Sequence, residues 1–315
     1  MREFLNKIKR FFFEENVYSI GIRKREDKLL FEGNNKCFKV LPITRKEWYA
    51  DPIVFTYNGI DYLFCEVYDR KNNVGNIGVT VINGQALSKP QICLSIGSHL
   101  SYPMIFQLDS IIYMIPETTT TKNMVLYRAV DFPDKWEPVH TLISNIELAD
   151  STIFNDGDNT ILFTYEQFNG NGSVVKIRVF DANSINLGRL TQISEGDSYS
   201  NQLRGAGNLF FHKGKLIRPS QDCSKEYGYA LNFNKVKSYY NQYQEEKIST
   251  VLPVALNTDL EKKIIGVHTY ACTDKYEIID VKFNDVRILH QIKRLLKYIN
   301  RNIKRVLDNA NKRTA

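Results

Sequence analysis

The chain has 315 residues, of which 43% are hydrophobic and 12% aromatic, and its formal net charge is +7. These values exclude a disordered chain, and the length fits either two average domains or one large all-β domain. The charge is uneven, because residues 285–315 hold nine Lys and Arg against two Asp. The near-neutral remainder argues against a nucleic-acid-binding core, so we expect no nucleic-acid partner.

The cysteines and the apolar runs bear on where the chain resides. Its five cysteines are scattered with no CxxC pair, which favours free structural thiols in a reducing compartment over disulfides or a zinc site. No segment has the order of a signal peptide, and no run reaches about 18 uninterrupted apolar residues. We therefore expect a cytoplasmic protein without a membrane-spanning segment.

Three parts are expected along the chain. Residues 1–35 form an N-terminal basic and aromatic segment that contains "FLNKIKRFFF". Residues 36–283 are predicted to form the folded body. Residues 284–315 are predicted to form a basic amphipathic helix.

The body repeats itself about every fifty residues. The copies "DPIVFTYNGIDYLFCE" at 51, "YPMIFQLDSIIYMIPE" at 102, "DSTIFNDGDNTILFTYE" at 150 and "AGNLFFHKGKLIRPSQD" at 206 align, and the steps between them are 51, 48 and 56 residues. Each has a phenylalanine four residues after its first position: Phe55, Phe106, Phe154 and Phe210. A fifth, weaker copy falls near "VLPVALNTDLEKKIIGVHTY". This period is typical of β-propeller blades, so we predict an all-β, five-bladed β-propeller.

Each copy also predicts a β-hairpin. Its two apolar strands flank a short turn, which is in chain order Asn58-Gly59, Asp109-Ser110, Asp156-Gly157 and Lys213-Gly214. A two-residue turn at Asn58-Gly59 places Asp51 opposite Glu66. The same rule gives the pairs Tyr102 with Glu117 and Ala206 with Gln221, and it brings Asp150 near Tyr165 and Glu166.

The predicted registers bring polar side chains to one end of the hairpins. Such ends converge around the central channel of a propeller, where loops build the binding site. Two opposed carboxylates such as Asp51 and Glu66 repel each other unless a cation, a shared proton or the hydroxyls of a sugar separate them. A single acid in such a place can instead accept backbone N–H bonds. The candidate set is Asp51, Glu66, Tyr102, Glu117, Asp150, Glu166, Gln221 and Asp222.

Several unusual motifs resemble a known family. The set "WYADPIVF", "HLSYPMIF", "LYRAVDFPDKW", "DSTIF", "RPSQDCSKEYGYA" and "HTY" is similar to the propeller domain found at the N-terminus of plant glucosamine inositolphosphorylceramide transferases and in bacterial polysaccharide-locus proteins. The resemblance covers about residues 45–275. More distantly, the "ADP" opening resembles the five-bladed glycoside hydrolases of the arabinanase and β-xylosidase type (family 43). Both resemblances imply a glycan-facing site at the mouth of the channel.

The hydrolase resemblance implies roles for three positions. The general base matches Asp51, and a second Asp, which tunes the acid, matches Asp150. The general acid is a Glu that opens the fourth blade, and that position here is Gly205. Inverting hydrolysis needs an acid opposite the base to protonate the leaving oxygen. This departure weakens the hydrolase interpretation and is compatible with a transferase, whose phosphate leaving group needs cationic stabilisation more than a proton.

Under the transferase interpretation, Asp51 deprotonates the acceptor hydroxyl, and Glu66 or Glu117 could replace it in that role. Cations of the fourth blade would serve the phosphate: Arg204, Arg218 and Lys225. Sugar rings would be held by Tyr102, Glu166, Gln221, Asp222 and Tyr227. Arg218 is equally well explained by a salt bridge between blades.

His268 ends the fifth copy, where a side chain can reach the channel axis. The hydrolase resemblance implies a His near a central water or metal ion. A lone His is more often a hydrogen-bonded structural residue, so we predict no metal site and assign His268 to substrate binding. The sequence contains no H-E-x-x-H, Walker, G-x-S-x-G or dinucleotide motif, and it identifies no cofactor.

The C-terminal residues predict a basic helix. Apolar residues at 288, 292, 295, 296, 299, 303, 306 and 307 follow helical spacing, and Lys and Arg fill positions between them. Such a helix over residues 288–307 can lie in an anionic membrane interface. It can alternatively pack its apolar stripe on the propeller or on a second copy.

Together these features predict a glycan-active enzyme. The favoured interpretation is a glycosyltransferase of cell-surface polysaccharide or glycolipid assembly, acting at the cytoplasmic face of the membrane. Its partners would be an activated sugar donor, a glycan or lipid-linked acceptor, and an anionic membrane surface. The alternatives are a glycoside hydrolase with a displaced general acid and a non-catalytic glycan-binding propeller.

Overall fold

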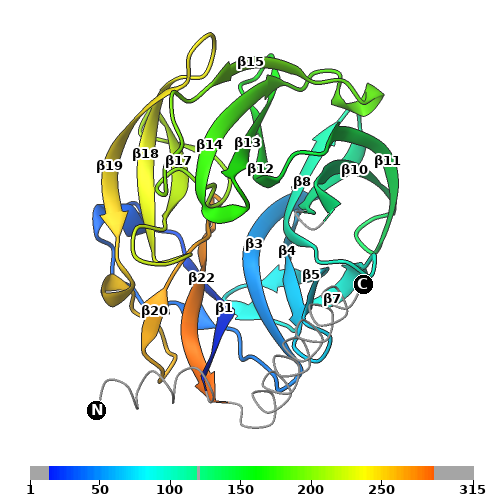
Figure 1. The fold of residues 1–315 in the computed structure, drawn as a ribbon. Coiled ribbons are helices and arrows are strands. Elements are labelled where there is room, and N and C mark those ends of the chain that lie inside the picture. The colour runs from blue at the N-terminus through cyan, green and yellow to red at the C-terminus, as the bar shows by residue number, and fades with distance from the viewer. Residues whose placement is uncertain (1–13, 119–120, 287–315) are drawn as a thin grey trace, which may run out of the picture. The chain divides into compact units, whose positions relative to one another are not determined.

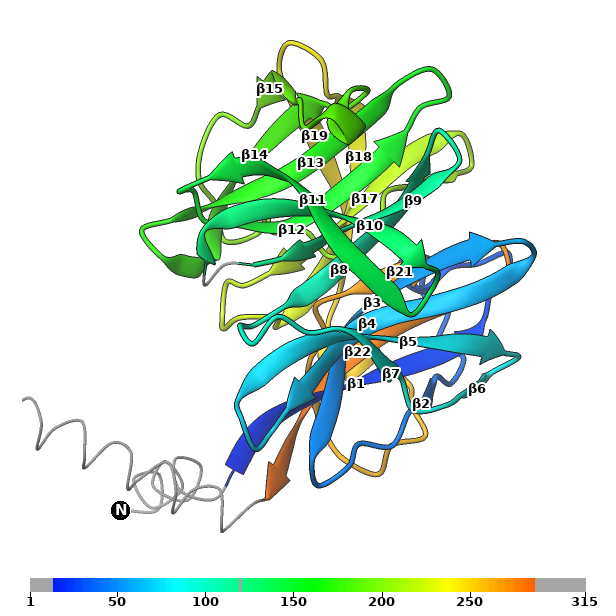
Figure 2. The same cartoon turned by 90° about the vertical axis from the view of Figure 1, so that its right-hand side faces the viewer.

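The structure is a computed structural model that describes residues 14–118 and 121–286. The chain divides into a unit of residues 18–282 and a second unit of residues 1–17 and 283–315. Five antiparallel sheets form the blades of a propeller, so the prediction of an all-β, five-bladed β-propeller is confirmed (Figures 1 and 2). The predicted helix over 288–307 and the segment "FLNKIKRFFF" lie outside the described residues.

The first two blades follow the first two copies of the repeat. The first has the strand order β3-β4-β5-β6, with β7 beside β5, and the second has the order β11-β10-β9-β8. The first blade contains β3 (Glu47–Tyr57), β4 (Ile60–Asp69), β5 (Val74–Asn83), β6 (Ala86–Leu87) and β7 (Gln91–Leu94). The second blade contains β8 (Ser101–Leu108), β9 (Ile111–Glu117), β10 (Asn123–Asp131) and β11 (Lys135–Ser144).

The third and fourth blades are regular four-stranded sheets. Their orders are β12-β13-β14-β15 and β16-β17-β18-β19. The third blade contains β12 (Leu148–Asn155), β13 (Thr160–Phe168), β14 (Asn171–Asp181) and β15 (Thr191–Glu195). The fourth contains β16 (Phe210–His212), β17 (Lys215–Asp222), β18 (Ala230–Ser238) and β19 (Gln244–Val251). Short 3₁₀ helices occur at η1 (Leu30–Glu32), η3 (Ile185–Leu187) and η4 (Pro253–Ala255).

The fifth blade joins strands from both ends of the described chain. Its order is β2-β1-β22-β20, with β21 beside β22. These strands are β1 (Glu14–Lys24), β2 (Lys39–Val40), β20 (Ile264–Gly266), β21 (Tyr270–Cys272) and β22 (Tyr276–Val286). The expected boundary at residue 36 would leave β1 outside the propeller, whereas β1 belongs to its fifth sheet. This pairing closes the ring and leaves no blade with only half of its strands.

The blades pack on one another through aromatic and aliphatic side chains. Between the first and second blades, Phe64, Ile105 and Met114 are buried in one cluster, against which Phe132 packs. The repeated phenylalanines contribute to such clusters, as Phe106 does between the second and third blades. Each large side chain buried in this way stabilises the fold by about 1.5–3 kcal/mol.

Three of the four predicted turns have the predicted length. Tyr57 pairs with Ile60, and the corresponding closing pairs in the second and fourth blades also enclose two residues. At Asn58-Gly59 both φ angles are positive, 49° and 77°, as a type I′ hairpin turn requires. The third hairpin closes with a longer loop, between Asn155 and Thr160.

The inner strands of the first three blades bulge at the same place, which the sequence did not reveal. The bulge residues Asp51, Tyr102 and Asp150 have φ angles of 53°, 41° and 46°. A left-handed conformation costs a non-glycine residue about 1–3 kcal/mol, so tertiary contacts must hold it. The three bulges aim equivalent side chains toward the same end of the propeller, where they are hydrogen-bonded across blades.

The bulges correct the predicted cross-strand pairs. Glu66 faces Ala50 rather than Asp51, and Glu117 faces Ser101 rather than Tyr102. In the fourth blade the bridge is Gly205 to Ser220, so the predicted pair of Ala206 and Gln221 is also wrong. The predictions assumed uninterrupted ladders. In the first two blades one extra residue on the inner strand shifts everything beyond it by one position, and in the fourth blade the shift between Phe210–Ile217 and Gly205–Ser220 is two positions.

Candidate functional site

Asp51 is the first residue of the candidate site. Its carboxylate is buried, with 6% of the residue exposed. The Thr269 hydroxyl donates to its Oδ1 at 3.0 Å, and the Tyr102 backbone N–H donates to its Oδ2 at 3.3 Å. His268 Nε2 lies 3.8 Å from Oδ1. The first, second and fifth blades therefore meet at this carboxylate.

Asp280 on β22 organises the surroundings of Asp51. Its Oδ2 accepts the backbone N–H of Asp51 at 3.1 Å and lies 2.5 Å from His268 Nδ1. Its Oδ1 accepts the backbone N–H groups of His268 and Thr269 at 3.0 and 2.9 Å. One fully buried carboxylate thus holds both the bulge of the first blade and the imidazole of the fifth.

The His268 ring is enclosed by aromatic side chains. Tyr18 stacks on one face, with ring centroids 4.4 Å apart and an interplanar angle of 15°. Tyr227 meets the ring edge-on at 5.6 Å. Gly228 leaves room for this packing, since a Cβ there would lie 3.1 Å from both the His268 Cβ and the Tyr18 hydroxyl. The imidazole orientation is therefore set by packing as well as by Asp280.

The charges of this cluster depend on one another. Burial opposes a charge on His268, but the Asp280 carboxylate outweighs burial and raises the pKa of the imidazole. Burial likewise opposes ionisation of Asp280, and the charge and hydrogen bonds of His268 outweigh it, so the pKa of Asp280 is lowered. Burial raises the pKa of Asp51, with His268 acting in the opposite direction. These directions favour a cationic His268 paired with an ionised Asp280, and His268 is the group that opposes the raised pKa of Asp51.

A second cluster surrounds Asp150 and Arg204. Arg204 Nε lies 2.7 Å from Asp150 Oδ2, and its Nη2 lies 3.1 Å from Glu117 Oε2. The Asp150 backbone N–H donates to Glu117 Oε2 at 3.0 Å. Burial raises the pKa of Asp150 well above its usual range, and Glu117 adds to this against the opposing charge of Arg204. One guanidinium beside two buried carboxylates leaves Asp150 holding its proton more readily than an isolated acid.

Arg204 is held by contacts to four residues. Besides the two acids, its Nη1 donates to the Gly172 carbonyl at 2.8 Å. Its guanidinium carbon lies 5.1 Å from the ring centroid of Tyr227, the same tyrosine that contacts His268. Tyr227 therefore spans the Asp51 and Asp150 clusters, and 37% of the residue is exposed.

The position aligned with the hydrolase acid has no room for a side chain. A Cβ on Gly205 would lie 2.5 Å from Tyr165 Cε2 and 2.8 Å from Asp150 Cβ. Contacts this short require the neighbours to move, and both neighbours are buried. The general acid of an inverting hydrolase is therefore sterically excluded at residue 205, beyond being absent from the sequence.

Glu66 is a second buried acid near Asp51. Its Oε1 is buried and, within the described residues, accepts no hydrogen bond; His99 Nε2 is 3.5 Å away. The Gly75 backbone N–H donates to His99 Nδ1 at 3.0 Å. Burial, followed by the charge of Asp51, raises the pKa of Glu66 well above its usual range. A protonated Glu66 would donate a hydrogen bond rather than act as the base.

Other predicted residues have structural partners. The Tyr102 hydroxyl bonds Thr152 Oγ1 at 3.0 Å and accepts the Gly207 backbone N–H at 2.8 Å. The Gln221 amide donates to the Gly205 carbonyl at 2.9 Å, and Asp222 accepts the Ser224 backbone N–H at 2.9 Å. These buried groups build the site rather than face an open space.

Three further predicted residues do not contact the two clusters. Glu166 bonds Arg178 at 2.8 Å within the third blade. Arg218 forms a salt bridge with Glu245 at 2.6 Å, but this bridge lies within the fourth blade and not between blades. The contact of Arg218 to the third blade is a hydrogen bond to the Tyr165 hydroxyl at 3.2 Å. The remaining predicted cation, Lys225, is exposed and its Nζ lies 2.8 Å from the Tyr229 hydroxyl.

Asp51, His268 and Asp280 offer ligand atoms within 4.8 Å of one another, the only such triad among the described residues. His268 Nδ1 is bonded to Asp280, and the Asp51 oxygens accept protein donors. His268 Nε2 lies 3.8 Å from Asp51 Oδ1, beyond hydrogen-bonding distance.

Sequence analysis missed Asp280, Thr269, His99 and Tyr18. Asp280 is a charged residue within the largely apolar run "IIDVKF", which is the signal that could have drawn attention to it. Tyr18 lay in the segment assigned outside the propeller. Thr269 and His99 lie in the motifs "HTY" and "HLSYPMIF", but nothing in those motifs assigned them a role.

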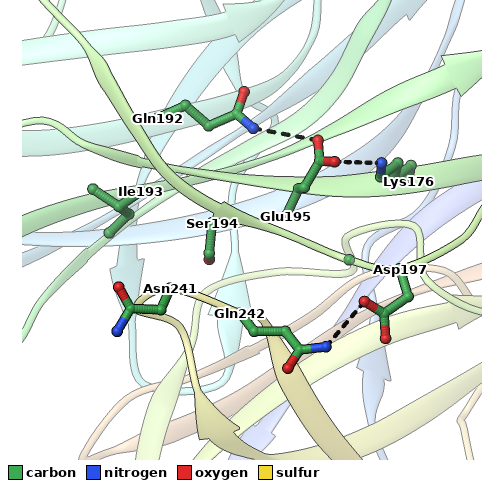
Figure 3. A pocket seen from close by; sticks show the side chains of 9 residues that line it. Lys176, Gln192, Ile193, Ser194, Glu195, Asp197, Asn241 and Gln242 are labelled. Atoms are coloured by element: carbon green, nitrogen blue, oxygen red, sulfur yellow. Dashed lines mark hydrogen bonds and ion pairs between the residues drawn. The ribbon is translucent and has the colours of Figure 1, made fainter.

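A polar pocket of about 520 Å³ lies elsewhere, between β15 and the loop that precedes β19 (Figure 3). Lys176 and Gln192 bond Glu195, and Gln242 bonds Asp197, so its charged groups are paired with one another. None of the predicted site residues lines it. In the described part of the chain, no helix is long and apolar enough to cross a membrane.

The fold is similar to that of solved glycoside hydrolases. A thermostable family-43 glycoside hydrolase superposes with a TM-score of 0.52 at 14% identity, covering 78% of this chain and 91% of that one. A β-xylosidase superposes with a TM-score of 0.54 at 10% identity, covering 76% and 92%. At these identities the likeness concerns the fold.

The particular family is defined by sequence. The family model "Glucosamine inositolphosphorylceramide transferase 1, N-terminal" matches residues 32–271, and the chain belongs to this family. Glucosamine inositolphosphorylceramide transferase 1 of Oryza sativa subsp. japonica is 29% identical over 220 residues. The match covers 68% of this chain and 29% of the relative, so the chain spans less than a third of that protein's length.

Proposed function

We propose that this protein is a glycan-active enzyme that transfers a sugar from an activated donor to an acceptor hydroxyl. The observation that carries the proposal is the buried Asp51 carboxylate, held beside the His268–Asp280 pair, in a site whose hydrolase acid position is closed at Gly205. Membership of a family named for a transferase supports the same reaction class.

Asp51 is the base in this mechanism. Its carboxylate accepts the proton of the acceptor hydroxyl as the oxygen forms a bond to the anomeric carbon. The bond from that carbon to the leaving phosphate oxygen breaks, and the electron pair leaves with the phosphate. Arg204 and Arg218 are already paired with carboxylates, which leaves Lys225 as the predicted fourth-blade cation exposed to a phosphate.

Tyr227 is the sugar-binding side chain of this proposal. It contacts His268 and lies over Arg204, and its exposed surface gives a pyranose ring an aromatic platform beside both acidic clusters. Transfer of an activated sugar to a glycan or a lipid-linked acceptor fits cell-surface polysaccharide or glycolipid assembly. We place this activity at the cytoplasmic face of the membrane on the strength of the basic residues at 288–307 in the sequence alone.

A glycan-binding propeller without turnover is the second candidate. It is favoured by the coverage of the plant relative, 29%, which leaves most of that protein outside the match. In this case the propeller would present a glycan to a partner's catalytic domain. The closed position at Gly205 opposes a hydrolase that carries its acid there, and hydrolysis with a displaced general acid is the third candidate.

A ligand screen tests the proposal. Thermal unfolding is followed with nucleotide sugars, free nucleotides, polyprenyl-phosphosugar analogues and neutral oligosaccharides, because a ligand raises stability in proportion to the logarithm of its concentration over Kd. Wild type is compared with Asp51→Asn and with the control Asp61→Asn, whose carboxylate pairs with Lys275 on the fifth blade. Positive donors are then incubated with acceptors, and products are detected by mass spectrometry.

The outcomes separate the candidates. Stabilisation by an activated sugar, with product formed by wild type and Asp61→Asn but not by Asp51→Asn, supports transfer. Stabilisation by neutral oligosaccharides alone, without product, supports the binding candidate. Release of reducing ends from oligosaccharides would contradict both and restore hydrolysis.

A further inference from the structure

Asp280 makes four polar contacts to the residues around Asp51. Its two oxygens accept three backbone N–H groups and bond one imidazole nitrogen, and these partners come from β3 and from the segment that precedes β21. Glu277, another buried acid of β22, pairs with Arg23 at 2.8 Å. Asp280 pairs with a histidine whose other nitrogen faces Asp51.

We propose that Asp280 is a positioning residue that acts through His268, so that Asp51, His268 and Asp280 work as one unit in which a cationic imidazole keeps the Asp51 carboxylate ionised and aimed. The inference rests on the proposed function in that Asp51 is the base. It adds a carboxylate and a charged histidine, neither of which sequence analysis assigned to the reaction.

The three side chains lie close enough for their charges to interact. Asp280 Oδ2 is 2.5 Å from His268 Nδ1, and His268 Nε2 is 3.8 Å from Asp51 Oδ1. Opposite charges at such separations in a buried site favour the ionised forms of both partners. Tyr18 stacked on the imidazole keeps Nε2 directed at Asp51, and the Thr269 hydroxyl completes the coordination of the same oxygen.

Other groups around Asp51 oppose its ionisation. Burial raises its pKa first, and the charges of Asp280 and Glu117 add to this. Glu66 on β4 belongs to the same cluster of interacting charges, and its own pKa is raised by burial and by Asp51. Arg204 on the fourth blade disfavours a charge on His268, while Tyr18 and Tyr227 contribute apolar ring surface. His268 is therefore the partner on which an ionised Asp51 depends.

His268 and Asp280 do not change which bonds form and break in the transfer step. Asp51 takes the acceptor proton, the acceptor oxygen bonds the anomeric carbon, and the leaving phosphate oxygen keeps the electron pair of the broken bond. His268 holds its proton throughout, and Asp280 stays ionised. The proton on Asp51 returns to solvent after the products leave.

The first experiment measures the charge of His268 directly and needs no substrate. The imidazole nitrogens of the full chain are labelled with ¹⁵N, and the His268 signals are assigned with His268→Gln. We expect an imidazolium in wild type at neutral pH, and a neutral ring in Asp280→Asn. Asp61→Asn, which removes an acid bonded to Thr56 at the turn end of the first hairpin, should leave the His268 signals unchanged. A neutral His268 in the wild-type protein would overturn the proposal even if Asp280→Asn does not fold.

The second experiment separates positioning from simple structural support. An opposite charge nearby lowers a carboxyl pKa by about 1–3 units. Loss of the imidazolium in Asp280→Asn should therefore move the acidic limb of kcat/KM upward, by less than this amount because the negative charge of Asp280 is lost with it. Activity should then recover at alkaline pH. An equal loss at all pH values would mean that Asp280 only supports the fold. If wild type transfers no sugar from any donor, the proposed function fails while the ¹⁵N result still decides the state of His268.

Discussion

Asp51 in the first blade and Asp150 in the third stand on equivalent bulges, with φ angles of 53° and 46°, yet they have different partners. Asp51 meets a histidine held by a second acid, whereas Asp150 meets an arginine shared with Glu117. Repetition of the backbone sets the direction of the two side chains. The neighbouring blades set their charge, so equivalent positions in a repeat need not have equivalent chemistry.

The largest expected effect is the loss of activity in Asp51→Asn. Asparagine keeps the shape but cannot accept the acceptor proton, and a positioned general base contributes about 10²–10⁴-fold. We expect kcat/KM for transfer to fall by that amount with the folded state retained in far-ultraviolet circular dichroism. Asp150→Asn should fall less, because Asp150 is engaged by Arg204. Equal losses in the two variants would remove the distinction between the two aspartates.

The next effect concerns the stability of the Asp150 cluster. Arg204→Met leaves Glu117 and Asp150 buried without their cation, and breaking a buried pair in this way costs about 3–5 kcal/mol. Urea unfolding should show this loss in the free energy of unfolding. Asp51→Asn measured in parallel should cost less, since it removes a charge and leaves His268 paired with Asp280. A stable Arg204→Met variant would mean that the two acids are already neutral without arginine.

A smaller effect is expected at Gly205. In Gly205→Ala the added methyl group meets Tyr165 and Asp150 at 2.5 and 2.8 Å. Overpacking of this kind costs about 1–3 kcal/mol, and thermal unfolding should report it. The matched control is Gly196→Ala, where the nearest atoms lie 3.8 Å away and the added methyl group fits. If both variants were equally stable, position 205 could accommodate an acid and the hydrolase alternative would regain support.

The smallest expected effect is a change in how the free energy of unfolding depends on pH. Burial raises the folded-state pKa of Glu66 above the usual 4.5, so its folded state binds the proton more tightly and stability falls as pH rises through that folded pKa. Glu66→Gln should match wild type in acid and exceed it increasingly at higher pH. Asp61→Asn should behave oppositely, because the hydrogen bonds of Lys275 and Thr56 outweigh burial and lower the pKa of Asp61. Urea unfolding across the pH range gives both trends, and parallel curves for the two variants would contradict the assignment.

Much of the fold follows from the sequence because the repeat is visible in it. The spacing of Phe55, Phe106, Phe154 and Phe210 gives the blade period, and the weaker fifth copy completes the number of blades. The Asn58-Gly59 turn gives the register as far as Ile53. The register fails beyond that point because a bulge leaves no mark in a strand that is apolar on both faces. The strand β1 was misplaced because its partner β22 lies at the far end of the chain.

The candidate site was predicted in part for the same reason. Asp51 and Asp150 open aligned copies, so the repeat itself points to them. Asp280 does not belong to the aligned part of any copy, and its role depends on a strand that closes the ring. Arg218 was assigned to a phosphate because sequence shows its charge but not Glu245, which neutralises that charge from two strands away.

The most direct test of the central claim is the ionisation of Asp51 compared with that of Asp150. Aspartate carboxyl carbons are labelled with ¹³C, the two signals are assigned with Asp51→Asn and Asp150→Asn, and both are followed through a pH titration. The account predicts that Asp51 ionises at the lower pH, is a carboxylate at neutral pH, and titrates higher in Asp280→Asn. An Asp51 that remains protonated at neutral pH, or that ionises after Asp150, would show that Asp51 is not the base.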